Sequence, residues 1–353
     1  MPEADSFAQR VLRWFDAHGR KNLPWQTPRS AYRVWVSEIM LQQTQVATVI
    51  PYFLRFVEKF ASIAELAAAP IDDVLASWSG LGYYSRARNL HATAKICVER
   101  HHADLPREFE NLSALPGIGR STAGAILAQA HGFRFAILDG NVKRVLARFH
   151  GVRGWPGSTS TQKILWEKSA SHLPESRVAD YTQAMMDLGA TVCVRSRPRC
   201  TECPLSSDCT ALRDGLTAQL PESKPQRAIP SRSTMMLILR DASGRLLLRR
   251  RPPTGVWAEL WSLPEAGDID IAKREVAAIH TSRDSDFVFQ HLPTFTHVFS
   301  HYKLDIAPIA FDAVMKSHVA DDANQRWVSP SEAAKLGLPA PVRKLIEQLK
   351  EST

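Results

Sequence analysis

Four cysteines form the pattern with the clearest chemical meaning in this chain. Cys193, Cys200, Cys203 and Cys209 lie within seventeen residues, whereas the fifth cysteine, Cys97, stands alone. Four thiolates on one short loop can enclose a metal, and because zinc and iron–sulfur clusters both accept four thiolates, the spacing leaves the metal open. Clustered cysteines favour a metal site over disulfides and fit a reducing compartment, while the isolated Cys97 is expected to be buried and inert.

Three arginines separate the first two of these cysteines. Arg195, Arg197 and Arg199 would be gathered when the loop closes around a metal, and guanidinium groups bind phosphate oxygens well. The alternative is a basic loop that is merely solvated. The whole chain carries 44 Lys and Arg against 36 Asp and Glu, a net charge of +8 with a pI near 9.4. This balance favours a polyanionic partner such as nucleic acid.

A glycine turn in LPGIGRSTAGAI, residues 115–126, is the next candidate. Pro116, Gly117 and Gly119 predict a tight turn that leads into a helix starting near Ser121. The N-terminus of a helix offers backbone N–H groups to an anion, so the turn predicts a phosphate contact. A glycine turn between two helices is also a common connector, and in isolation the pattern is weak.

Two carboxylates complete the set of candidate residues. Asp139 follows the apolar FAIL and precedes VKRVLARF, where its type suits a helix N-cap, and capping alone can explain it. Glu38 lies in VSEIMLQQTQV, residues 36–46, which predicts a helix with Glu38, Gln42 and Gln45 on one stripe. Such a stripe is usually solvated surface, so spacing alone assigns these carboxylates no chemistry.

The elements that must position these residues fall into two parts. Apolar residues recur every three or four positions from about residue 6 to residue 212, which predicts a bundle of short helices broken at Pro51, Pro70, Pro106, Pro116, Pro156 and Pro174. The stretch 221–232 is polar and rich in proline, and is interpreted as a linker. From residue 233, MMLILR, a turn at 241–244 and RLLLRR predict strand, turn and strand. We therefore expect a helical domain over 1–220 and an α+β domain over 233–353.

Several classes of protein are disfavoured. The chain has no run of eighteen apolar residues and no hydrophobic segment behind its N-terminus, so we expect neither a membrane span nor a signal peptide, but a cytoplasmic protein without a membrane partner. No internal repeat is present, which disfavours a solenoid. We expect a monomer.

Six segments together resemble the helix-hairpin-helix DNA glycosylases and, within them, the adenine DNA glycosylase or MutY family. They are LPW at 23–25, SEIMLQQTQV at 37–46, GLGYYSRARNL at 80–90, LPGIGRSTAGAI, LDGNVKR at 138–144 and the four-cysteine loop. The resemblance implies a six-helix barrel with a cluster domain up to about residue 212, joined to a Nudix-like α+β domain. It covers nearly the whole chain.

The resemblance also implies an activity and a cofactor. Members of this family remove adenine paired with 8-oxoguanine or guanine in double-stranded DNA and leave an abasic site. By resemblance, Glu38 is the acid that protonates the flipped adenine, and Asp139 is the carboxylate that stabilises the oxocarbenium-like sugar. The four cysteines would hold one [4Fe–4S] cluster, and the turn with Gly117 and Gly119 would bind DNA phosphate.

Further site residues follow from the resemblance. Adenine would contact Trp25 and Gln183, whose amide can donate to N7 and accept from the N6 amine. The residues implied around the opposite base are Gln43, Leu81, Tyr83, Phe299, Ser300 and His301. Ser121 occupies the position where strand-cutting relatives carry a lysine, so we expect no lyase step.

The C-terminal domain departs from true Nudix hydrolases. Those enzymes bind Mg²⁺ with paired glutamates on a helix, whereas the corresponding stretch here, residues 274–278, has Glu275 alone. One carboxylate is a poor Mg²⁺ site, so we expect recognition without nucleotide hydrolysis.

Three alternatives remain. The first is a bifunctional endonuclease III-like glycosylase with AP lyase activity, which the missing lysine and the extra domain disfavour. The second is a non-catalytic iron–sulfur protein that binds DNA or senses redox state, in which Glu38 and Asp139 are ordinary surface and capping residues. The third is a Nudix hydrolase with a DNA-binding appendage, which the incomplete metal helix disfavours.

Overall fold

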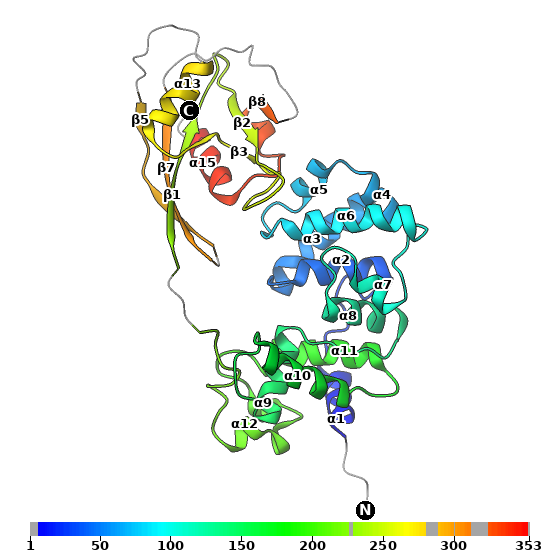
Figure 1. Ribbon diagram of the computed structural model, residues 1–353. Helices are drawn as coiled ribbons and strands as arrows, with labels where there is room; N and C mark the ends of the chain where they lie inside the picture. Colours follow the sequence, from blue (N-terminus) through cyan, green and yellow to red (C-terminus); the bar gives the residue numbers. More distant parts are fainter. Residues whose placement is uncertain (1–5, 226–228, 280–288, 300, 312–323, 352–353) are drawn as a thin grey trace, which may run out of the picture. The chain divides into compact units, whose positions relative to one another are not determined.

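The computed structural model describes residues 6–225, 229–279, 289–299, 301–311 and 324–351, and the chain divides into two compact units (Figure 1). The first unit comprises residues 1–68 and 89–226, and the second comprises residues 69–88 and 227–353. The second unit therefore takes in a segment from the middle of the helical region, which periodicity along the chain does not reveal.

The first unit is built from helices, as the spacing of apolar residues predicts. Its helices are α1 (Phe7–His18), α2 (Ala31–Leu41), α3 (Val46–Lys59), α4 (Ile63–Ala68), most of α6 (Ser85–Arg100), α7 (Phe109–Ser113), α8 (Arg120–His131), α9 (Gly140–His150), α10 (Thr159–Ser171), α11 (Val178–Asp187) and α12 (Thr210–Arg213). A π-helical turn, Leu188–Val192, follows α11, and two short 3₁₀ turns lie among the cysteines. Among the described residues, no helix is long and apolar enough to cross a membrane.

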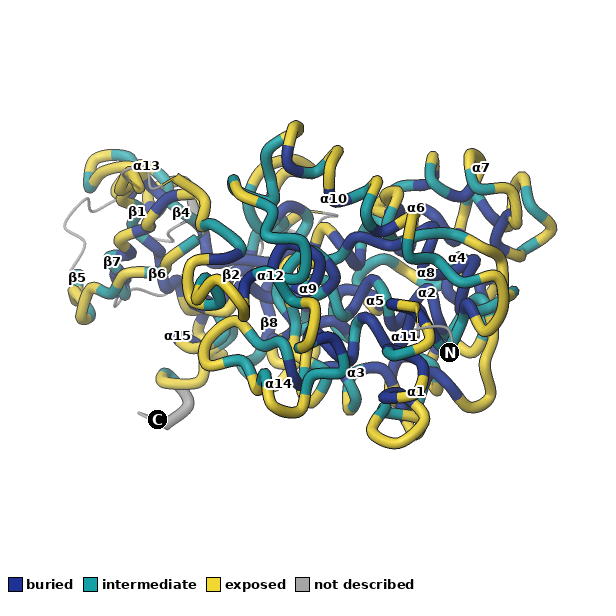
Figure 2. The backbone as a smooth tube through the Cα atoms, turned by 90° about the horizontal axis from the view of Figure 1, so that it is seen from below, coloured by how far each residue is buried: buried dark blue, intermediate teal, exposed yellow. Residues whose placement is uncertain are grey.

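Helix α8 lies at the centre of this unit. All seven residues from Ala123 to Gln129 are buried, which is the pattern of a helix enclosed on every side (Figure 2). A Cβ on Gly124 would lie 2.6 Å from the carbonyl oxygen of Ala136. Only glycine therefore allows α8 to pack this closely against the extended segment that leads to Asp139.

Two local predictions about helix limits are wrong. Pro51 does not break a helix but lies inside α3. The carbonyl that loses its N–H partner is that of Ala47, four residues earlier, and because Ala47 is exposed, water can bind it. The helix predicted over 36–46 ends at Leu41, and Gln43 adopts a left-handed φ of 59°. This turn separates α2 from α3, so Gln42 and Gln45 occupy helix ends and not a continuous stripe.

The second unit has the predicted α+β composition. Its strands are β1 (Ser231–Ile238), β2 (Leu246–Arg250), β3 (Trp261–Ser262), β4 (Glu265–Ala266), β5 (Phe289–His291), β6 (Phe295–Val298), β7 (Lys303–Phe311) and β8 (Gln325–Val328), and its helices are α5 (Ile71–Ser77), α13 (Ile269–Ile279), α14 (Pro330–Ala333) and α15 (Ala340–Glu351). One sheet has the order β4-β1-β7-β5 with β6 also paired to β7, and a second sheet has the order β3-β2-β8. Strand β1 begins at Ser231, so the last two residues of the predicted linker are strand residues.

Both faces of the larger sheet are covered. Met236 and Ile238 of β1 pack in one core with residues of α15, whereas Leu237 and Leu239 pack in another with residues of α13 (Figure 1). Strand side chains alternate between faces, so a strand buried on both sides appears in sequence as a continuous apolar run. That explains the run MMLIL at the start of this unit.

Candidate active site and cysteine pocket

A cavity of about 1010 Å³ in the first unit brings most of the predicted residues together. It is lined by side chains from the ends of α2, α8, α9 and α11, and its volume suits a nucleoside-sized ligand. The predicted residues that line it are Trp25, Glu38, Gln43, Ser121, Asp139, Gln183 and Arg195. Glu38 and Asp139, separated by about a hundred positions in sequence, therefore face the same space.

Asp139 is fixed as the N-cap of α9. Its carboxylate accepts hydrogen bonds from the Val142 backbone N–H at 2.8 Å and from the Asn141 side-chain amide at 3.3 Å. The preceding residue is held as well, because the backbone N–H of Leu138 donates to Ser121 Oγ at 2.9 Å. The helix N-terminus and these donors favour the ionised form of Asp139. Capping and a place in the cavity thus coexist in one residue.

Glu38 has a different environment. It is half-buried in the last turns of α2, where Gln129 Nε2 donates to its Oε1 at 3.1 Å. Burial raises the pKa of Glu38 to about 7, and the nearby Asp139 carboxylate adds to that rise, while the Gln129 hydrogen bond opposes both. Burial also raises the pKa of Asp139, but the donors from Val142 and Asn141 oppose that shift. The donors around Asp139 favour its ionised form, and an ionised Asp139 in turn favours the protonated form of Glu38.

Gln183 is held by a buried carboxylate that sequence reasoning missed. Its Nε2 donates to Asp187 Oδ1 at 2.7 Å, and Asp187, of which 1% is exposed, also accepts from Arg20 through the backbone N–H and the guanidinium. A carboxylate accepts only, so this bond fixes which end of the amide faces Asp187. One of the two N–H groups of the Gln183 amide is thereby occupied, and the amide is oriented with its oxygen Oε1 away from Asp187.

Among the residues that line the cavity or bond to its lining side chains, one carries a signal that the sequence could have revealed. Gln129 is buried within the apolar run AGAILAQA, and a buried polar side chain in such a run needs a partner, which is a detectable signal. Arg20 and Asp187 carry no comparable signal because they are 167 residues apart and meet only in the fold. Trp25 is 2% exposed and packs edge-on against Phe53 at 5.4 Å between centroids, so it forms a rigid wall.

The glycine turn has the predicted form. Gly117 has a φ of +77°, and a Cβ there would lie 2.9 Å from Asn89 Cβ, so this position requires glycine. Gly119 is the N-cap of α8 and provides no side-chain cap. The first N–H groups of α8 are therefore not satisfied by a capping side chain, as an anion-binding helix end requires.

The three arginines of the cysteine loop have different surroundings. Arg195 lines the cavity that contains the carboxylates, whereas Arg199 lines the pocket of the cysteines. Arg199 also donates to the Thr191 carbonyl and pairs with Glu202 at 3.3 Å, which holds it against its own loop. Arg197 is exposed, with a left-handed φ of 53°.

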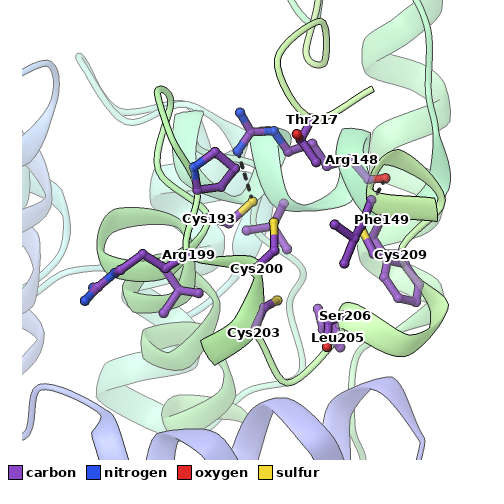
Figure 3. A pocket seen from close by; sticks show the side chains of 14 residues that line it. Arg148, Phe149, Cys193, Arg199, Cys200, Cys203, Leu205, Ser206, Cys209 and Thr217 are labelled. Atoms are coloured by element: carbon purple, nitrogen blue, oxygen red, sulfur yellow. Dashed lines mark hydrogen bonds between the residues drawn. The ribbon is translucent and has the colours of Figure 1, made fainter. Parts of the chain in front are cut away.

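The four clustered cysteines line a single pocket (Figure 3). Among the residues that the structure describes, no three metal-binding side chains meet closely enough to hold one ion. Burial raises the pKa of Cys203 to about 11, and the neighbouring thiols add to the shift. A cationic group would relieve that repulsion by binding the thiolates, so the donor set fits a thiolate-ligated metal centre.

A buried arginine of α9 organises this pocket. Arg148 is 2% exposed, and its Nη1 donates to Cys193 Sγ at 3.4 Å and to the Val194 carbonyl at 2.7 Å (Figure 3). Its Nη2 donates to the carbonyl of Arg195, and its Nε donates to that of Leu220 at 2.7 Å. One side chain thus joins the start of the cysteine segment to Leu220, eleven residues beyond the last cysteine.

A second arginine of α9 connects the pocket to the carboxylate site. Arg144 donates to the carbonyl of Cys193 at 2.6 Å and to Asn141 Oδ1 at 2.8 Å. Asn141 in turn donates to Asp139. The helix that Asp139 caps therefore also holds the first cysteine.

The remaining predicted residues lie in the second unit. Leu81 is buried and Tyr83 is 52% exposed in the turn between α5 and α6. Phe299 and His301 belong to an aromatic group that includes Trp257, with centroids of Phe299 and Trp257 5.1 Å apart. Ser300 lies outside the described residues.

Glu275 of α13 is engaged by a neighbouring strand. Its Oε2 lies 2.5 Å from Nη1 of Arg249 in β2. The single glutamate of the incomplete Nudix-type helix thus has a cationic partner from the protein itself.

Comparison with known proteins agrees with these two parts. The family of HhH-GPD superfamily base excision DNA repair proteins matches residues 36–171, and the NUDIX domain family matches residues 234–348. An adenine DNA glycosylase of Buchnera aphidicola (subsp. Acyrthosiphon pisum) is 36% identical over 351 residues, which cover 98% of each chain. That of Mus musculus is 32% identical and covers 99% of this chain and 79% of its own length.

Solved structures resemble the helical part. A thermostable thymine-DNA glycosylase covers 59% of this chain and 95% of its own, with a TM-score of 0.54 and 25% identity. An endonuclease III in a trapped covalent intermediate with DNA covers the same share with a TM-score of 0.51 and 21% identity, which shows the fold alone. The predicted fold class, a helix-hairpin-helix glycosylase domain joined to a Nudix-like α+β domain, is confirmed.

Proposed function

The chain belongs to the adenine DNA glycosylase family, and from this premise we propose that Glu38 and Asp139 together hydrolyse the N-glycosidic bond of an adenine flipped out of duplex DNA. The observation that carries the assignment is their shared cavity, in which the pKa of Glu38 is raised to about 7 while Asp139 is held by helix-end donors. The site thus offers one acid and one anion to a single substrate.

The two carboxylates have complementary roles. Glu38 donates its proton to adenine N7, so that the electron pair of the breaking C1′–N9 bond leaves on a neutral base. Water then adds to C1′ and gives up one proton to a carboxylate, which restores the proton that Glu38 donated. General acid catalysis of this kind contributes about 10²- to 10⁴-fold. An anion at about 4 Å from the cationic sugar contributes roughly 4 kcal/mol at an effective dielectric constant of about 20. Asp139 supplies that anion.

The other cavity residues support adenine recognition. Because its amide nitrogen is bonded to Asp187, Gln183 presents Oε1 as an acceptor for the N6 amine, and Trp25 forms a flat wall. Ser121 uses its hydroxyl to accept the Leu138 N–H and has no amine, so the reaction ends at the abasic site without a Schiff base.

The DNA substrate is proposed to be a duplex with adenine opposite 8-oxoguanine or guanine. Gln43, Leu81 and Tyr83 contact the opposite base, and residues 299–301 recognise 8-oxoguanine. The turn with Gly117 and Gly119 and the loop with Arg195, Arg197 and Arg199 contact phosphates. The exposed ring of Tyr83 supports the first role, and the left-handed Gly117 with the uncapped start of α8 supports the last.

We assign one [4Fe–4S] cluster to Cys193, Cys200, Cys203 and Cys209. The four thiols line one pocket, and four cysteine thiolates are the usual ligand set of a [4Fe–4S] cluster. The cluster would hold the loop closed and carry no step of hydrolysis. Iron and sulfide should be found in the purified protein at four of each per chain, and zinc without iron would contradict the assignment.

The domain roles are proposed to follow the sequence division. Residues 1–220 would carry catalysis, 221–232 would form the linker, and 233–353 would recognise 8-oxoguanine. The protein would act as a monomer on cytoplasmic DNA. Changes in residues 233–353 should then alter the preference for 8-oxoguanine without abolishing hydrolysis.

A single assay tests the proposed function. A duplex with 8-oxoguanine opposite labelled adenine is incubated with the protein and divided, with and without later alkali. Strand breakage after alkali alone indicates a glycosylase without lyase activity, whereas breakage without alkali indicates an AP lyase. A duplex with adenine opposite thymine is the control, and equal release from both duplexes would contradict the proposed mispair preference.

A further inference from the structure

The turn that carries Tyr83 has an unusual backbone. Between α5 and α6, Gly80 and Gly82 have φ values of +103° and +72°, and Tyr83 itself has a φ of +50°. A tyrosine adopts the left-handed region only where the surrounding structure determines it. The exposed ring of Tyr83 therefore depends on neighbours that hold its backbone.

Part of that support is local. Arg86 Nη2 donates to the carbonyls of Leu81 and Gly82 at 3.2 and 3.1 Å, and Trp78 Nε1 donates to the same Gly82 carbonyl at 3.1 Å. The guanidinium carbon of Arg86 also lies 5.5 Å from the ring centroid of Tyr83. These contacts fix the turn just before Tyr83.

The remaining support for the Tyr83 turn comes from residues 227–353 of the same unit, which we call the C-terminal part. Tyr84, 9% exposed, donates its hydroxyl proton to the Leu338 carbonyl at 3.0 Å. Its oxygen lies 3.2 Å from Ser79 Oγ, and Arg343 Nη2 donates to Ser79 Oγ at 2.5 Å. A hydroxyl has one proton, so the direction of every bond follows: Arg343 donates to Ser79, Ser79 to Tyr84, and Tyr84 to Leu338. We call these four residues the relay.

Close packing and a second arginine accompany the relay. A Cβ on Gly337, the residue before Leu338, would lie 3.0 Å from Leu75 Cβ of α5. Arg88, in the first turn of α6, donates to the carbonyl of Ala258 at 2.8 Å. The C-terminal part therefore contacts the segment 69–88 on both sides of the turn.

We propose that Tyr84 and Arg343 are positioning residues for Tyr83: through the relay, the C-terminal part holds the turn that presents Tyr83 to the base opposite adenine. The inference rests on the proposed function of Tyr83 and deepens it. The C-terminal part would thus influence opposite-base recognition through the turn as well as through residues 299–301.

Hydrogen exchange in the DNA-free protein tests the structural half. Tyr84→Phe, Arg343→Met and Ser79→Ala each remove part of the relay, and amides of residues 79–88 should exchange about tenfold faster, as expected for the loss of one hydrogen bond. Ser79→Ala removes the least volume and keeps the test decisive if a larger change unfolds the protein. The matched control is Tyr32→Phe, which deletes a hydroxyl bond to the Phe60 carbonyl in the other unit. Unchanged exchange at 79–88 in the relay variants would overturn the proposal.

A double-mutant cycle tests the functional half. The measured quantity is the ratio of single-turnover adenine release from 8-oxoguanine:adenine and guanine:adenine duplexes. Tyr84→Phe should lower this ratio towards that of Tyr83→Ala, and should change it less than about twofold when Tyr83 is already alanine. An equal loss in both backgrounds would show that Tyr84 acts independently of Tyr83 and would overturn the inference. Equal release from the two duplexes by the wild type would contradict the proposed recognition of 8-oxoguanine, and hydrogen exchange would still decide the relay.

Discussion

Replacing Glu38 with glutamine removes the acidic proton and keeps the size and shape of the side chain. The new amide would keep an oxygen that can accept from Gln129 Nε2, now 3.1 Å from Glu38, so the cavity wall should stay intact. The variant loses the only acid that we assign to the reaction. We expect Glu38→Gln to bind duplex DNA normally and to release adenine about 10²- to 10⁴-fold more slowly at pH 6.

The raised pKa of Glu38 predicts the pH dependence of the wild type. Only the protonated form is an acid, and its pKa is about 7, so the rate should fall tenfold per pH value above that point. This alkaline limb, the part of the profile where the rate falls with rising pH, belongs to Glu38. Asp139 acts as an anion, so its ionisation would raise the rate instead of lowering it. The remaining adenine release by Glu38→Gln should therefore not decline as the pH rises above 7.

The same pKa predicts that Glu38→Gln, which lowers the activity, raises the stability of the protein at high pH. A glutamate with a pKa of 4.5 when unfolded and about 7 when folded binds its proton more tightly in the fold. Its stabilising contribution is therefore complete below pH 4.5 and is lost as the pH rises through 7, by about 3 kcal/mol in total. Because glutamine does not ionise, Glu38→Gln should equal the wild type at low pH and exceed it by up to about that amount at pH 8.

Two measurements check this reasoning. Single-turnover release is followed from pH 5 to 9, and thermal unfolding of wild type and variant is compared at pH 5 and pH 8. Glu110→Gln, an exposed change of the same type on α7, is the control. Near wild-type release by Glu38→Gln, or a stability difference that does not depend on pH, would refute the assignment.

Three further predictions concern residues around the cavity. Gln129→Leu removes a hydrogen bond that lowers the pKa of Glu38, so the alkaline limb should move to higher pH, and a limb that stays in place would contradict this role. Asp187→Asn no longer forces the orientation of the Gln183 amide, so the preference for adenine over purine, which lacks the N6 amine, should fall, at a cost of about 1–3 kcal/mol in stability. Ser121→Lys places an amine in the cavity and should give a covalent complex trapped by borohydride, whereas a folded, active variant that cannot be trapped would argue against our account of the missing lyase step.

Local signals in the sequence predict the structure well where the physics is local. The residue type of Asp139 predicts a helix N-cap, and its carboxylate accepts the Val142 N–H. The glycine turn and the strand, turn and strand after residue 233 also form as predicted, because turn and cap preferences depend on a few neighbouring residues. Motif resemblance places Glu38 in the same site, which spacing alone does not.

Contacts between distant residues are not visible in the sequence. Asp187 has the pattern of an ordinary helix residue until Arg20 and Gln183 are placed beside it. Periodicity misses the end of α2 at Leu41 because the apolar period continues past it, although Gln43 reverses the backbone. The relay is equally hidden, since Tyr84 and Leu338 are separated by 254 positions. Hydrophobic periodicity identifies the buried face of a helix or strand, but it does not identify the element against which that face packs.

The buried Arg148 determines where the catalytic part of this protein can be cut. Its Nε has a single partner among the bonds described above, the carbonyl of Leu220, eleven residues beyond the last cysteine. An expression fragment that stops at Cys209 would leave a cationic nitrogen without an acceptor in a side chain that is 2% exposed, at a cost of several kcal/mol. Shortened versions for crystallisation or NMR should therefore retain residue 220, or the metal-binding loop will lose its anchor before any ligand is removed.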